Sequence, residues 1–529
     1  MTARRLDDLL RGIALPAQGD IVVSGMTLDS RSVQPGDAFM ALAGAKHHGI
    51  EFADTAIEQG AVVVLAEGAA EDRGWGLGTG GVRAELPVVD VPSPQPPAPT
   101  PVVWIDNLRT HLGAIAARFY DDPSASMTVI GVTGTSGKTS TVQMLAQAFA
   151  HLGRRAATIG TLGAGLHGAI RAGEHTTPDV IRVHGLLAEF REAGATDVAM
   201  EVSSHALDQH RVDGVHFDVA VFTNLTRDHL DYHGTMEAYG AAKARLFAWP
   251  DLRGAVINVD DPFGRELATK FAKEIGRHPG QGMAGTQPRG QKQQILRYGI
   301  DSADADVGAT DVHLHADGID FRLSTPWGAG TVHSRLLGRF NVANLLAVAG
   351  VLGALEVPFD RISSALEALE PIAGRMNRLG GGAAPLVVVD YSHKPDPLEQ
   401  VLATLRAHCE GKLVCVFGCG GERDAGKRPV MGAIAERLAD VVIVTDDNPR
   451  GEDGDAIVAQ IVAGMSAPER ALVERDRARA IALAIGQAGA GDVILIAGKG
   501  HETYQETAGV KRPFDDLAVA RSTLETQPC

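Results

Sequence analysis

A glycine-rich turn that separates an apolar run from a helical segment has the residue types needed to bind a triphosphate. Residues 128–141 read TVIGVTGTSGKTST, and the turn itself is Gly134-Thr135-Ser136-Gly137. Glycines allow successive backbone N–H groups to point at one anion, and the N-terminus of the following helix adds partial positive charge. Lys138 can then reach the outer phosphates, while Thr139 offers a hydroxyl to Mg²⁺. The stretch therefore predicts a nucleoside triphosphate site.

This loop is a variant of the strict phosphate-binding pattern GxxxxGK[ST], because Val132 stands where the first glycine belongs. A glycine-rich turn with an incidental lysine is the alternative interpretation. The β-branched run at 128–130 and the helical segment at 142–152 favour the nucleotide site, because together they give the order strand, loop, helix.

Three further residues could complete the chemistry of such a site. Glu201 closes an apolar run, and a carboxylate near Thr139 suits Mg²⁺, which takes few carboxylates together with phosphates and water. His229 follows the next apolar run and could be a second metal ligand or an ordinary hydrogen-bonding residue; the sequence leaves both open. Lys243 lies in the helical stretch 236–247 and, taken alone, reads as a solvated lysine.

The composition bounds the class of protein. A chain of 529 residues exceeds one hydrophobic core, so two to four domains are expected. The net charge of −16 argues against a surface for duplex nucleic acid or anionic membrane. Asp7 and Asp8 interrupt any signal-peptide core, and no run of about 18 apolar residues occurs, so we expect a soluble, unsecreted protein. The four cysteines are expected to be reduced thiols.

Short apolar runs that alternate with helical segments must position these residues. In the first part, helices are predicted at 50–59 and 107–120, and the expected strands are 21–23, 38–42, 61–65, 88–91 and 102–105. The Pro-rich stretch 92–101 reads as part of an exposed insertion. These elements predict a small α/β domain.

The central part has the pattern of a parallel sheet with crossover helices. Its strands are expected at 128–130, 197–202, 219–225 and 255–259. The stretch 276–294 reads as a Gly- and Gln-rich insertion. Alternating residues at 312–323 around Asp317-Gly318 predict a hairpin, and a helix is expected at 341–355.

The last part repeats the strand, polar loop and helix pattern, which predicts a doubly wound, Rossmann-like domain. The expected strands are 386–389, 413–417, 441–444 and 493–496. Polar loops at the strand ends of this domain and of the central one are expected to meet across a cleft. The overall fold class is therefore α/β with three domains, at 1–123, 124–370 and 371–529.

Eleven motifs spread along nearly the whole chain resemble those of the Mur ligases, in the order found in that family. They are TGTSGKTS (133–140), HTTPD (175–179), EVSSHALDQHRV (201–212), FTNLTRDHLDYHGT (222–235), AAKARLF (241–247), GRFNVAN (338–344), GRM (374–376), DYSHKPD (390–396), GCGGERDAGKRP (418–429), DDNPR (446–450) and AGKGHE (497–502). The Thr-Gly-Thr form of the phosphate loop is also the one found in this family.

The resemblance implies an ATP-dependent amide ligase of peptidoglycan precursor synthesis and cell wall biogenesis. The first domain would hold the uridine end of UDP-MurNAc-L-Ala-D-Glu, the central domain ATP, and the last domain the incoming amino acid. The D-Glu side-chain carboxylate would attack the γ-phosphate to give an acyl phosphate, which the amine of the amino acid then displaces. The family's role for Lys243 is as a carbamylated lysine, because CO₂ converts the cation to an anion that can bind a metal.

The resemblance also implies which residues bind ATP and metal. The catalytic residues would be Lys138, Glu201, His229 and Lys243. The Mg²⁺ ligands would be Thr139 and Glu201 for one ion, and His229 with carbamylated Lys243 for a second. The ATP-binding residues would be Gly134, Thr135, Ser136, Gly137, Lys138, Thr139, Ser140, Asn341, Asn344, Arg375 and Asp390.

Substrate-binding residues follow from the same resemblance. Those that match contacts to the nucleotide-sugar peptide are Ser30, Thr176, Thr177, Ser203, Gln209 and Arg211; those that match contacts to the amino acid are Arg423, Asp447, Asn448, Arg450, Gly498 and Glu502. Meso-diaminopimelate and L-lysine differ by one distal carboxylate, and a guanidinium pairs with a carboxylate through two parallel hydrogen bonds. Arg450 in DDNPR is that guanidinium, so diaminopimelate is the expected amino acid.

Other readings remain. They are a lysine-adding Mur ligase, a folylpolyglutamate-type ligase, and a phosphate-loop NTPase that does conformational work. The expected partners are two small molecules, UDP-MurNAc-L-Ala-D-Glu and meso-diaminopimelate, with no nucleic acid and no membrane insertion. We expect a cytoplasmic monomer.

Overall fold

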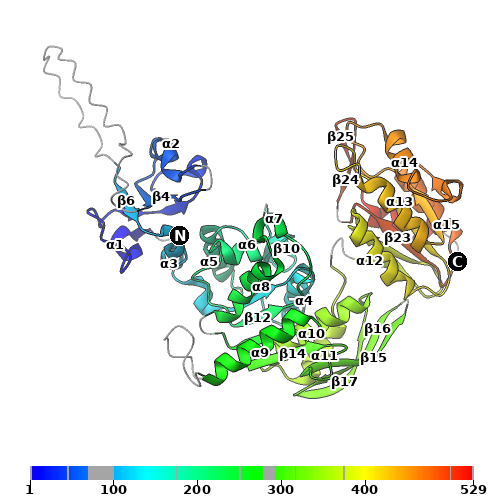
Figure 1. The fold of residues 1–529 in the computed structure, drawn as a ribbon, viewed down its shortest axis with the longest axis horizontal. Coiled ribbons are helices and arrows are strands. Elements are labelled where there is room, and N and C mark those ends of the chain that lie inside the picture. The colour runs from blue at the N-terminus through cyan, green and yellow to red at the C-terminus, as the bar shows by residue number, and fades with distance from the viewer. Residues whose placement is uncertain are drawn as a thin grey trace, which may run out of the picture.

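The computed structural model describes residues 3–44, 47–68, 100–173, 175–249, 252–277, 294–315, 317–372, 376–500 and 502–526. The chain forms three units in sequence order, with the first and last units on either side of the central one (Figure 1). The predicted strand at 88–91, Arg375 and most of the two insertions, at 92–101 and 276–294, lie outside the described residues.

The first unit is built on a parallel sheet whose strands follow chain order, β3 (Gly25–Thr27), β4 (Asp37–Ala41), β5 (Val63–Glu67) and β6 (Val102–Ile105). The remaining elements are β1 (Arg4–Arg5), α1 (Leu6–Leu9), β2 (Val22–Val23), α2 (Ala53–Glu58) and α3 (Leu108–Phe119). The apolar side of α3 packs on the start of α5 (Val180–Glu192), where Val180 and Ile181 join the hydrophobic core of this unit. This contact fixes the first unit to the central one.

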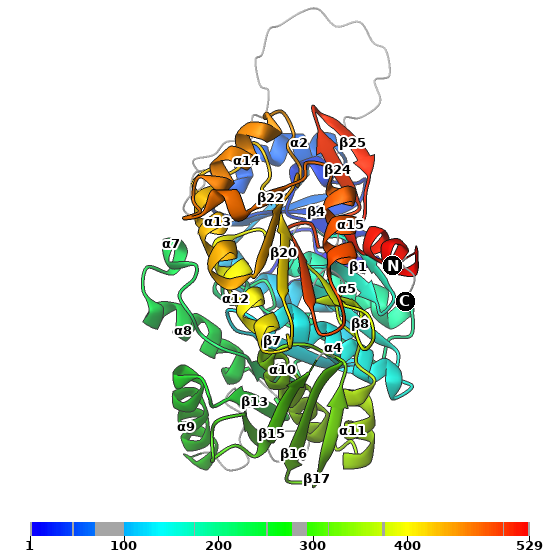
Figure 2. The same cartoon turned by 90° about the vertical axis from the view of Figure 1, so that its right-hand side faces the viewer.

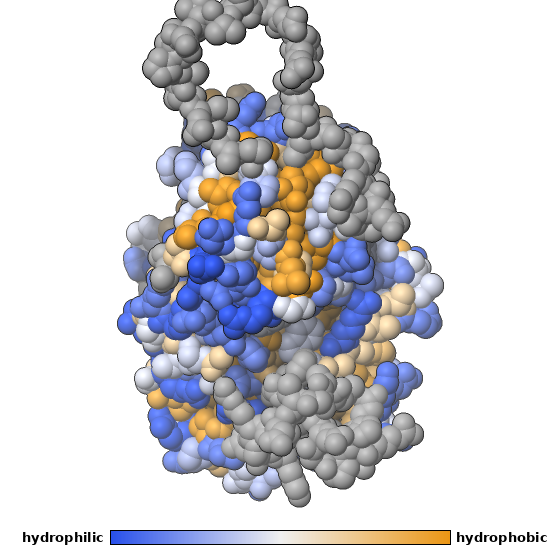
Figure 3. Space-filling model, turned by 90° about the vertical axis from the view of Figure 1, so that its left-hand side faces the viewer, coloured by the Kyte–Doolittle hydropathy of each residue, from blue (hydrophilic) through white to orange (hydrophobic). Residues whose placement is uncertain are grey.

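Some apolar side chains of the first unit face solvent, among them Leu15, Val22 and Phe52. Figure 3 shows hydrophobic residues gathered in the upper part of the face on which this unit lies. No helix among the described residues is both long enough and apolar enough to span a membrane.

The central unit contains a mixed sheet of eleven strands within the described residues, in the order β10-β9-β8-β11-β7-β12-β13-β14-β15-β16-β17. The strands from β8 to β15 in this order are parallel, and antiparallel strands extend both edges. The bounds are β7 (Thr128–Thr133), β8 (Ala156–Gly160), β9 (Gly163–Leu166), β10 (Ala169–Arg171), β11 (Asp197–Glu201), β12 (Val219–Phe222), β13 (Gly254–Asn258), β14 (Gln294–Gly299), β15 (Val307–His315), β16 (Gly318–Thr325) and β17 (Gly328–Ser334). The predicted hairpin at 312–323 is confirmed as β15–β16.

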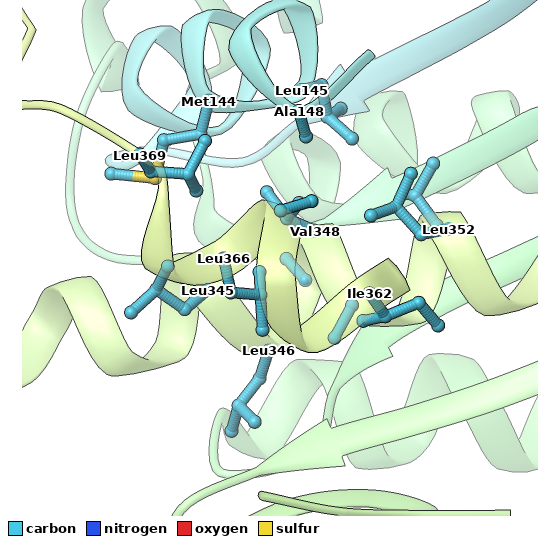
Figure 4. Packing of buried hydrophobic residues seen from close by; sticks show 14 of the residues in the cluster. Met144, Leu145, Ala148, Leu345, Leu346, Val348, Leu352, Ile362, Leu366 and Leu369 are labelled. Carbon is cyan, nitrogen blue, oxygen red and sulfur yellow. The ribbon is translucent and has the colours of Figure 1, made fainter. Parts of the chain in front are cut away.

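Helices cover both faces of this sheet. They are α4 (Lys138–His151), α5, α6 (Ser204–Asp208), α7 (Leu230–His233), α8 (Met236–Ala244), α9 (Pro262–Arg277), α10 (Arg339–Ala354) and α11 (Phe359–Glu367). Helix α10 is apolar on all sides because it lies between the sheet and the helices α4 and α11. Figure 4 shows Leu345, Val348 and Leu352 of α10 among apolar side chains of α4 and α11. The expected helical segment at 142–152 was too short at its start, because α4 already begins at Lys138, after Gly137 at the N-cap position.

The last unit has a sheet in the order β18-β19-β23-β20-β21-β22, parallel except for β18. Helices α12 to α14 pack on one face, and α15 and α16 on the other (Figure 2), which confirms a doubly wound unit. The bounds are β18 (Asn377–Gly380), β19 (Leu386–Asp390), α12 (Pro395–Arg406), β20 (Leu413–Phe417), α13 (Lys427–Leu438), β21 (Val441–Val444), α14 (Gly454–Val462), β22 (Leu472–Val473), α15 (Arg477–Gln487), β23 (Val493–Ala497), β24 (Tyr504–Thr507), β25 (Val510–Pro513) and α16 (Asp516–Thr526).

One expectation for this unit was wrong. Strand β23 is followed by the hairpin β24–β25 and only then by a helix. Ala508 (φ +50°) and Gly509 (φ +74°) at the turn both have left-handed backbone conformation, as a tight hairpin between twisted strands requires.

His408 links the central and last units. Its Nε2 accepts a hydrogen bond from the Gly338 N–H (2.9 Å), so its Nδ1 carries the proton and donates to the His315 carbonyl (2.8 Å). Nearby, Arg378 donates to the Asp317 carbonyl. The units therefore meet where β15 ends and where α10 begins.

Candidate functional site

The phosphate loop follows the central strand β7 and leads into α4, and it requires glycine at two positions. Gly134 (φ +146°) has no room for a side chain, because a Cβ there would lie 1.9 Å from Thr223 Oγ1. Gly137 (φ +84°) lies against α10, where a Cβ would be 2.9 Å from Asn344 Oδ1. The loop is thus held between β12 and α10 at the carboxyl end of the sheet, where parallel sheets bind ligands.

The residues after β12 brace this loop. Thr223 Oγ1 donates to the Ser136 carbonyl (2.6 Å), and Asn224 Oδ1 accepts from the Ser136 N–H (2.9 Å). The Thr135 hydroxyl lies 3.2 Å from the hydroxyl of Tyr239 on α8. The residues after β12 therefore fix the loop backbone, and Tyr239 of α8 approaches the Thr135 side chain.

Lys138 and Lys243 meet at one acceptor. Each Nζ donates to the Gly134 carbonyl at 2.8 Å, and Lys138 also donates to the Thr135 carbonyl (2.9 Å). Lys243 is 1% exposed and its Nζ lies 4.3 Å from the centre of the Tyr239 ring. Burial, and then the nearby charge of Lys138, lower the pKa of Lys243 to about 6. Lys243 is therefore a neutral amine at pH 7, and not the solvated cation that its sequence context alone indicates.

Glu201, at the end of β11, is a buried carboxylate next to the loop. It accepts hydrogen bonds from the Thr161 N–H (2.7 Å) and hydroxyl (3.2 Å), and from the hydroxyl of Thr139. Burial raises the pKa of Glu201, while the Thr161 N–H and the charge of Lys138 oppose that shift. The structure thus brings Thr139, Lys138 and Glu201 together, as the sequence predicted.

His229 lies near this group, at the N-terminus of α7, with a left-handed backbone (φ +53°). Its imidazole is 3.5 Å from a carboxylate oxygen of Asp228, and its ring centroid is 6.1 Å from that of Tyr239. His229 and Lys243 therefore approach the same tyrosine ring. Within the described residues, no three or more His, Cys, Asp or Glu side chains are grouped so that they alone could hold a metal ion.

The predicted adenosine contacts lie on α10 and on β19. Asn344 Nδ2 donates to Asn341 Oδ1 (2.9 Å), and both side chains are buried. Asp390, also buried, accepts from the Met376 N–H (2.9 Å) and from the Ser392 hydroxyl. Arg375 lies outside the described residues.

A basic cavity of about 680 Å³ lies between the first and central units. The first unit contributes Leu28, Leu42, Arg109 and Leu112 to its wall. The charged and imidazole residues of the wall are Arg109, Arg171, His175, Asp179, Arg182, His210 and Arg211. Four arginines against one carboxylate make this cavity suited to an anionic ligand.

Several predicted substrate residues border this cavity. Gln209 and Arg211 line it, and the Arg211 guanidinium donates to Gln209 Oε1 and to the Thr177 carbonyl (3.0 Å). The Thr177 hydroxyl donates to the Glu201 carbonyl (2.8 Å) and lies 3.5 Å from Ser203 Oγ. Glu201 is thus connected to the cavity wall through one threonine.

Two other predicted substrate residues lie close to this wall. The Thr176 hydroxyl is 3.0 Å from the Thr161 hydroxyl. Ser30, in a short turn capped by the Asp29 carboxylate, is buried and does not line the cavity, although Leu28 does.

The predicted amino-acid residues cluster at the strand ends of the last unit. Asn448 Nδ2 donates to Glu502 Oε2 (2.8 Å), and Lys499 Nζ donates to Asn448 Oδ1 and to the same Glu502 oxygen (both 3.1 Å). Asp447 Oδ1 lies 3.9 Å from Lys499 Nζ. Burial raises the pKa of Asp447, against the charges of Arg477 and Lys499.

Arg450 lies beside this cluster with a left-handed backbone (φ +54°). Its guanidinium donates to the Gly421 carbonyl (2.8 Å) and lies 3.9 Å from Glu506 Oε2. Arg423 is exposed on the neighbouring loop. Gly498 (φ +119°) donates its N–H to the Asp390 carbonyl (3.1 Å), which ties the cluster to β19.

The structure does not join the two halves of the predicted site. Across the described ranges, no hydrogen bond or ion pair connects the phosphate loop with Arg450 or its neighbours; the recorded bonds between these units are those around His408 and Arg378. The expectation that the polar loops meet across a cleft stays a prediction, because a cleft requires no bonds across it.

Several residues of the candidate site were not predicted from the sequence, because they are far apart along the chain. The arginines Arg109, Arg171 and Arg182 come from separate elements and have no common motif, so only the fold brings them to one cavity. Lys499 stands inside the motif AGKGHE, yet nothing in the sequence says that its side chain points inward.

Three family models match the chain. The model described as "Mur ligase family, catalytic domain" matches residues 22–120, "Mur ligase middle domain" matches 132–352, and "Mur ligase, glutamate ligase domain" matches 374–500. Together these matches take in the phosphate loop, Glu201 and Arg450.

Curated relatives match over nearly the full length. Proteins named UDP-N-acetylmuramoyl-L-alanyl-D-glutamate--2,6-diaminopimelate ligase are 54% identical in Xanthomonas oryzae (98% of this chain, 97% of the relative) and 48% identical in Pseudomonas aeruginosa (96% of each). A solved structure of a ligase with the same name is similar at a TM-score of 0.74 and 33% identity, covering 99% of each chain. A folylpolyglutamate synthase from Mycobacterium tuberculosis shares the fold at a TM-score of 0.54, with 18% identity over 79% of this chain and 96% of that one.

Proposed function

The chain belongs to the Mur ligase family, and on that premise we propose that it adds meso-diaminopimelate to the D-Glu side-chain carboxylate of UDP-MurNAc-L-Ala-D-Glu, with ATP as the energy source. The observation that carries this assignment is 54% identity over 98% of the chain to relatives named for that reaction. The product belongs to peptidoglycan precursor synthesis.

The reaction has two steps, and ATP is needed because a carboxylate is a poor acyl donor. The D-Glu carboxylate oxygen attacks the γ-phosphorus of ATP, which forms the acyl phosphate and releases ADP. The amine of diaminopimelate then attacks the acyl carbon, so that phosphate leaves and the amine loses a proton. Both reactants of the first step are anions, and the ammonium of Lys138 beside the loop supplies positive charge between them.

Thr139 and Glu201 would hold Mg²⁺ on the triphosphate. Their oxygens fit this ion, because Mg²⁺ prefers hard oxygen ligands and keeps places for phosphate and water. Glu201 is already held in place by Thr161, and its carboxylate receives the Thr139 hydroxyl. When bound, the ion would neutralise charge on the phosphates.

Carbamylated Lys243 and His229 would hold a second ion. The carbamate forms when the neutral Nζ attacks CO₂, an N–C bond forms, and the nitrogen loses a proton. Only a neutral amine can do this, and a lysine whose pKa is lowered to about 6 is neutral at the pH of a cell. Lys243 thus has the protonation state that the modification needs.

The basic cavity would take the nucleotide-sugar part of the substrate. Its arginines suit a diphosphate, and Gln209, Arg211 and Thr177 lead from the cavity wall to Glu201. The peptide carboxylate would thereby point from the cavity toward the nucleotide.

The cluster in the last unit would take diaminopimelate. Arg450 would pair with the distal carboxylate, with Arg423 as a second carboxylate contact, and Glu502 with the Gly498 carbonyl would receive the distal ammonium. Asp447 and Asn448 would complete the binding site for diaminopimelate in the last unit. In this scheme Asn341, Asn344, Arg375 and Asp390 contact the adenosine and phosphates.

The domain assignment that goes with this function has boundaries at 123/124 and 370/371. The first domain holds the uridine end through Ser30, the second ATP and the third the amino acid. We place the enzyme in the cytoplasm as a monomer.

A phosphate-release assay tests the proposed function. With ATP, Mg²⁺ and UDP-MurNAc-L-Ala-D-Glu, phosphate should be released when meso-diaminopimelate is added, and far less when L-lysine is added. Release with lysine alone would make this a lysine-adding enzyme. Release without either amino acid would indicate an NTPase.

A further inference from the structure

Lys499 is a fully buried lysine in the loop after β23. It is 0% exposed, and its ammonium faces Asn448 Oδ1 and Glu502 Oε2 (both 3.1 Å), Asp447 Oδ1 (3.9 Å) and the ring of Tyr504 (5.5 Å to the centre). Burying a lysine ammonium without hydrogen-bond partners costs free energy of folding. Fully buried lysines are therefore rare unless they are paired, and the partners of Lys499 indicate its role.

The ammonium fixes the orientation of two side chains. Asn448 Oδ1 accepts from Lys499 and from the Glu506 N–H of β24 (2.9 Å), so the Asn448 amide must turn its Nδ2 toward Glu502. Glu502 Oε2 then receives two donors, Lys499 and Asn448. Among the described residues Glu502 Oε1 receives none, which leaves it free for a ligand.

Two carboxyl groups lie around Lys499, with Glu502 Oε2 at 3.1 Å and Asp447 Oδ1 at 3.9 Å. Behind them, Arg477 and Asp516 form a buried ion pair (2.7 Å). Burial raises the pKa of Asp447, against the charges of Arg477 and Lys499. The second oxygen of Glu502 is therefore the acceptor in this cluster that suits a ligand ammonium.

We propose that Lys499 is a positioning residue for the amino-acid substrate. It holds Asn448 and Glu502 in the orientation that receives the distal ammonium of diaminopimelate. This inference rests on the proposed function and extends it to a residue that acts through its neighbours.

The first test replaces Lys499 with Met, which keeps the length of the side chain and removes the charge and its donors. The KM for meso-diaminopimelate should rise by about tenfold or more, the scale of losing charged hydrogen bonds, while the KM for ATP and for the nucleotide-sugar peptide changes less than about twofold. Leu402→Ala is the control, because Leu402 is buried in the same unit on α12 and its apolar side chain cannot form hydrogen bonds or ion pairs. It should lower the melting temperature and leave the KM for diaminopimelate unchanged.

A double variant tests whether Lys499 acts through Asn448. If it does, adding K499M to N448A should raise the KM for diaminopimelate little beyond N448A alone. A fully additive increase both with N448A and with E502Q would mean that Lys499 acts through neither residue and would overturn the proposal.

The pH dependence of the KM for diaminopimelate gives a second test, because a variant that only destabilised the fold would not change it. The charge of Lys499, together with that of Arg477, opposes the rise that burial causes in the pKa of Asp447, so K499M should raise the pKa of Asp447 further. The KM for diaminopimelate of K499M should therefore rise more steeply than that of the wild type as the pH falls from 8 to about 6.

The outcomes separate this inference from the proposed function. If wild-type protein uses diaminopimelate and K499M keeps the wild-type KM at every pH, the positioning role is wrong. A parallel rise in all three KM values, or a fall in kcat alone, would also count against it. Wild-type protein that ignores diaminopimelate would overturn the proposed function, and the inference with it.

Discussion

Lys243 and Lys499 are both buried lysines with different neighbours. Lys243 ends on a backbone carbonyl next to a second lysine, and its pKa is lowered to about 6. Lys499 ends between a side-chain amide and a carboxylate, with a second carboxylate close by. The first arrangement favours a neutral nucleophile. The second holds the lysine by hydrogen bonds to two side chains.

Lys243→Arg should remove activity, because a guanidinium stays charged and forms no carbamate with CO₂. We expect kcat to fall by about a hundredfold or more, the scale of losing one preorganised charged group. The measurement is phosphate release, together with ¹³C NMR after equilibration with ¹³CO₂. The carbamate signal should be present in the wild type and in K270R, which changes an exposed lysine of α9, and absent in K243R.

Arg450→Ala should raise the KM for meso-diaminopimelate by about 10- to 100-fold, because one carboxylate loses its guanidinium partner. The KM for ATP should stay within about twofold. Arg437→Ala serves as the control, since Arg437 is an exposed residue of α13 paired with Glu399. Equal KM values for diaminopimelate in R450A and wild type would rule out the role given to Arg450.

Among elements, the phosphate loop depends most directly on backbone conformation. Gly134→Ala should weaken ATP binding at least tenfold, because the added Cβ would overlap Thr223 Oγ1 and force the loop to move. Gly153, at the other end of α4, also has a positive φ (+77°), but a Cβ there meets nothing within 4 Å. Gly153→Ala should therefore cost some stability and leave ATP affinity, measured by calorimetry, unchanged.

The hydrogen bonds that His408, just after α12, makes to Gly338 and to the end of β15 should stabilise the protein less in acid. Burial lowers the pKa of His408, whose Nε2 must stay unprotonated to accept from Gly338. Its contribution to stability is complete above about pH 6.5 and is lost as the pH falls below that value, because the unfolded chain binds the proton first.

Thermal unfolding of His408→Ala tests this link. The variant should be less stable than wild type at pH 7.5 by about 1–3 kcal/mol, from the lost hydrogen bonds to buried backbone groups. The difference in the free energy of unfolding between H408A and wild type should become smaller as the pH is lowered toward 5.5. His167→Ala, at an exposed histidine, should follow the wild type at each pH; a constant difference between H408A and wild type would refute the titration.

Strands that are buried on both faces could be predicted from sequence alone, because continuous apolar runs bounded by polar loops leave little choice. The buried strands β20 and β21 have the predicted bounds, as does the less buried β6, and the phosphate loop lies where its pattern requires. The Thr139, Lys138 and Glu201 group followed from strand ends that meet at one edge of the sheet.

Other features could not be predicted because they depend on distant residues. The edge strands β9 and β10 are short and contain small residues, so they lack a periodic signal. The hairpin β24–β25 is exposed and polar and resembles a loop in sequence. The environment of Lys243, which sets its protonation, is created by residues more than a hundred positions away.

At the scale of the whole molecule, the acyl phosphate and the incoming amine belong to different units. Within the described residues, no hydrogen bond joins the phosphate loop to Arg450 and its neighbours, although the proposed reaction brings their ligands within bonding distance. We expect the last unit to move toward the central one during turnover, about the contacts near His408.

Small-angle X-ray scattering tests this movement. The radius of gyration should decrease when a non-hydrolysable ATP analogue and UDP-MurNAc-L-Ala-D-Glu are both added, because the ligands bridge the units. Adding L-lysine alone should leave it unchanged. An unchanged radius with all ligands bound would mean that closure is not part of the cycle.

The carbonyl of Gly134, which accepts from both Lys138 and Lys243, sets an order of events for the proposed chemistry. Burial is the larger cause of the lowered pKa of Lys243, and the positive charge of Lys138 beside it lowers that pKa further. A triphosphate would offset the charge of Lys138, so Lys243 would hold its proton more firmly once ATP is bound. Carbon dioxide should therefore react with Lys243 more readily before the nucleotide arrives than after it.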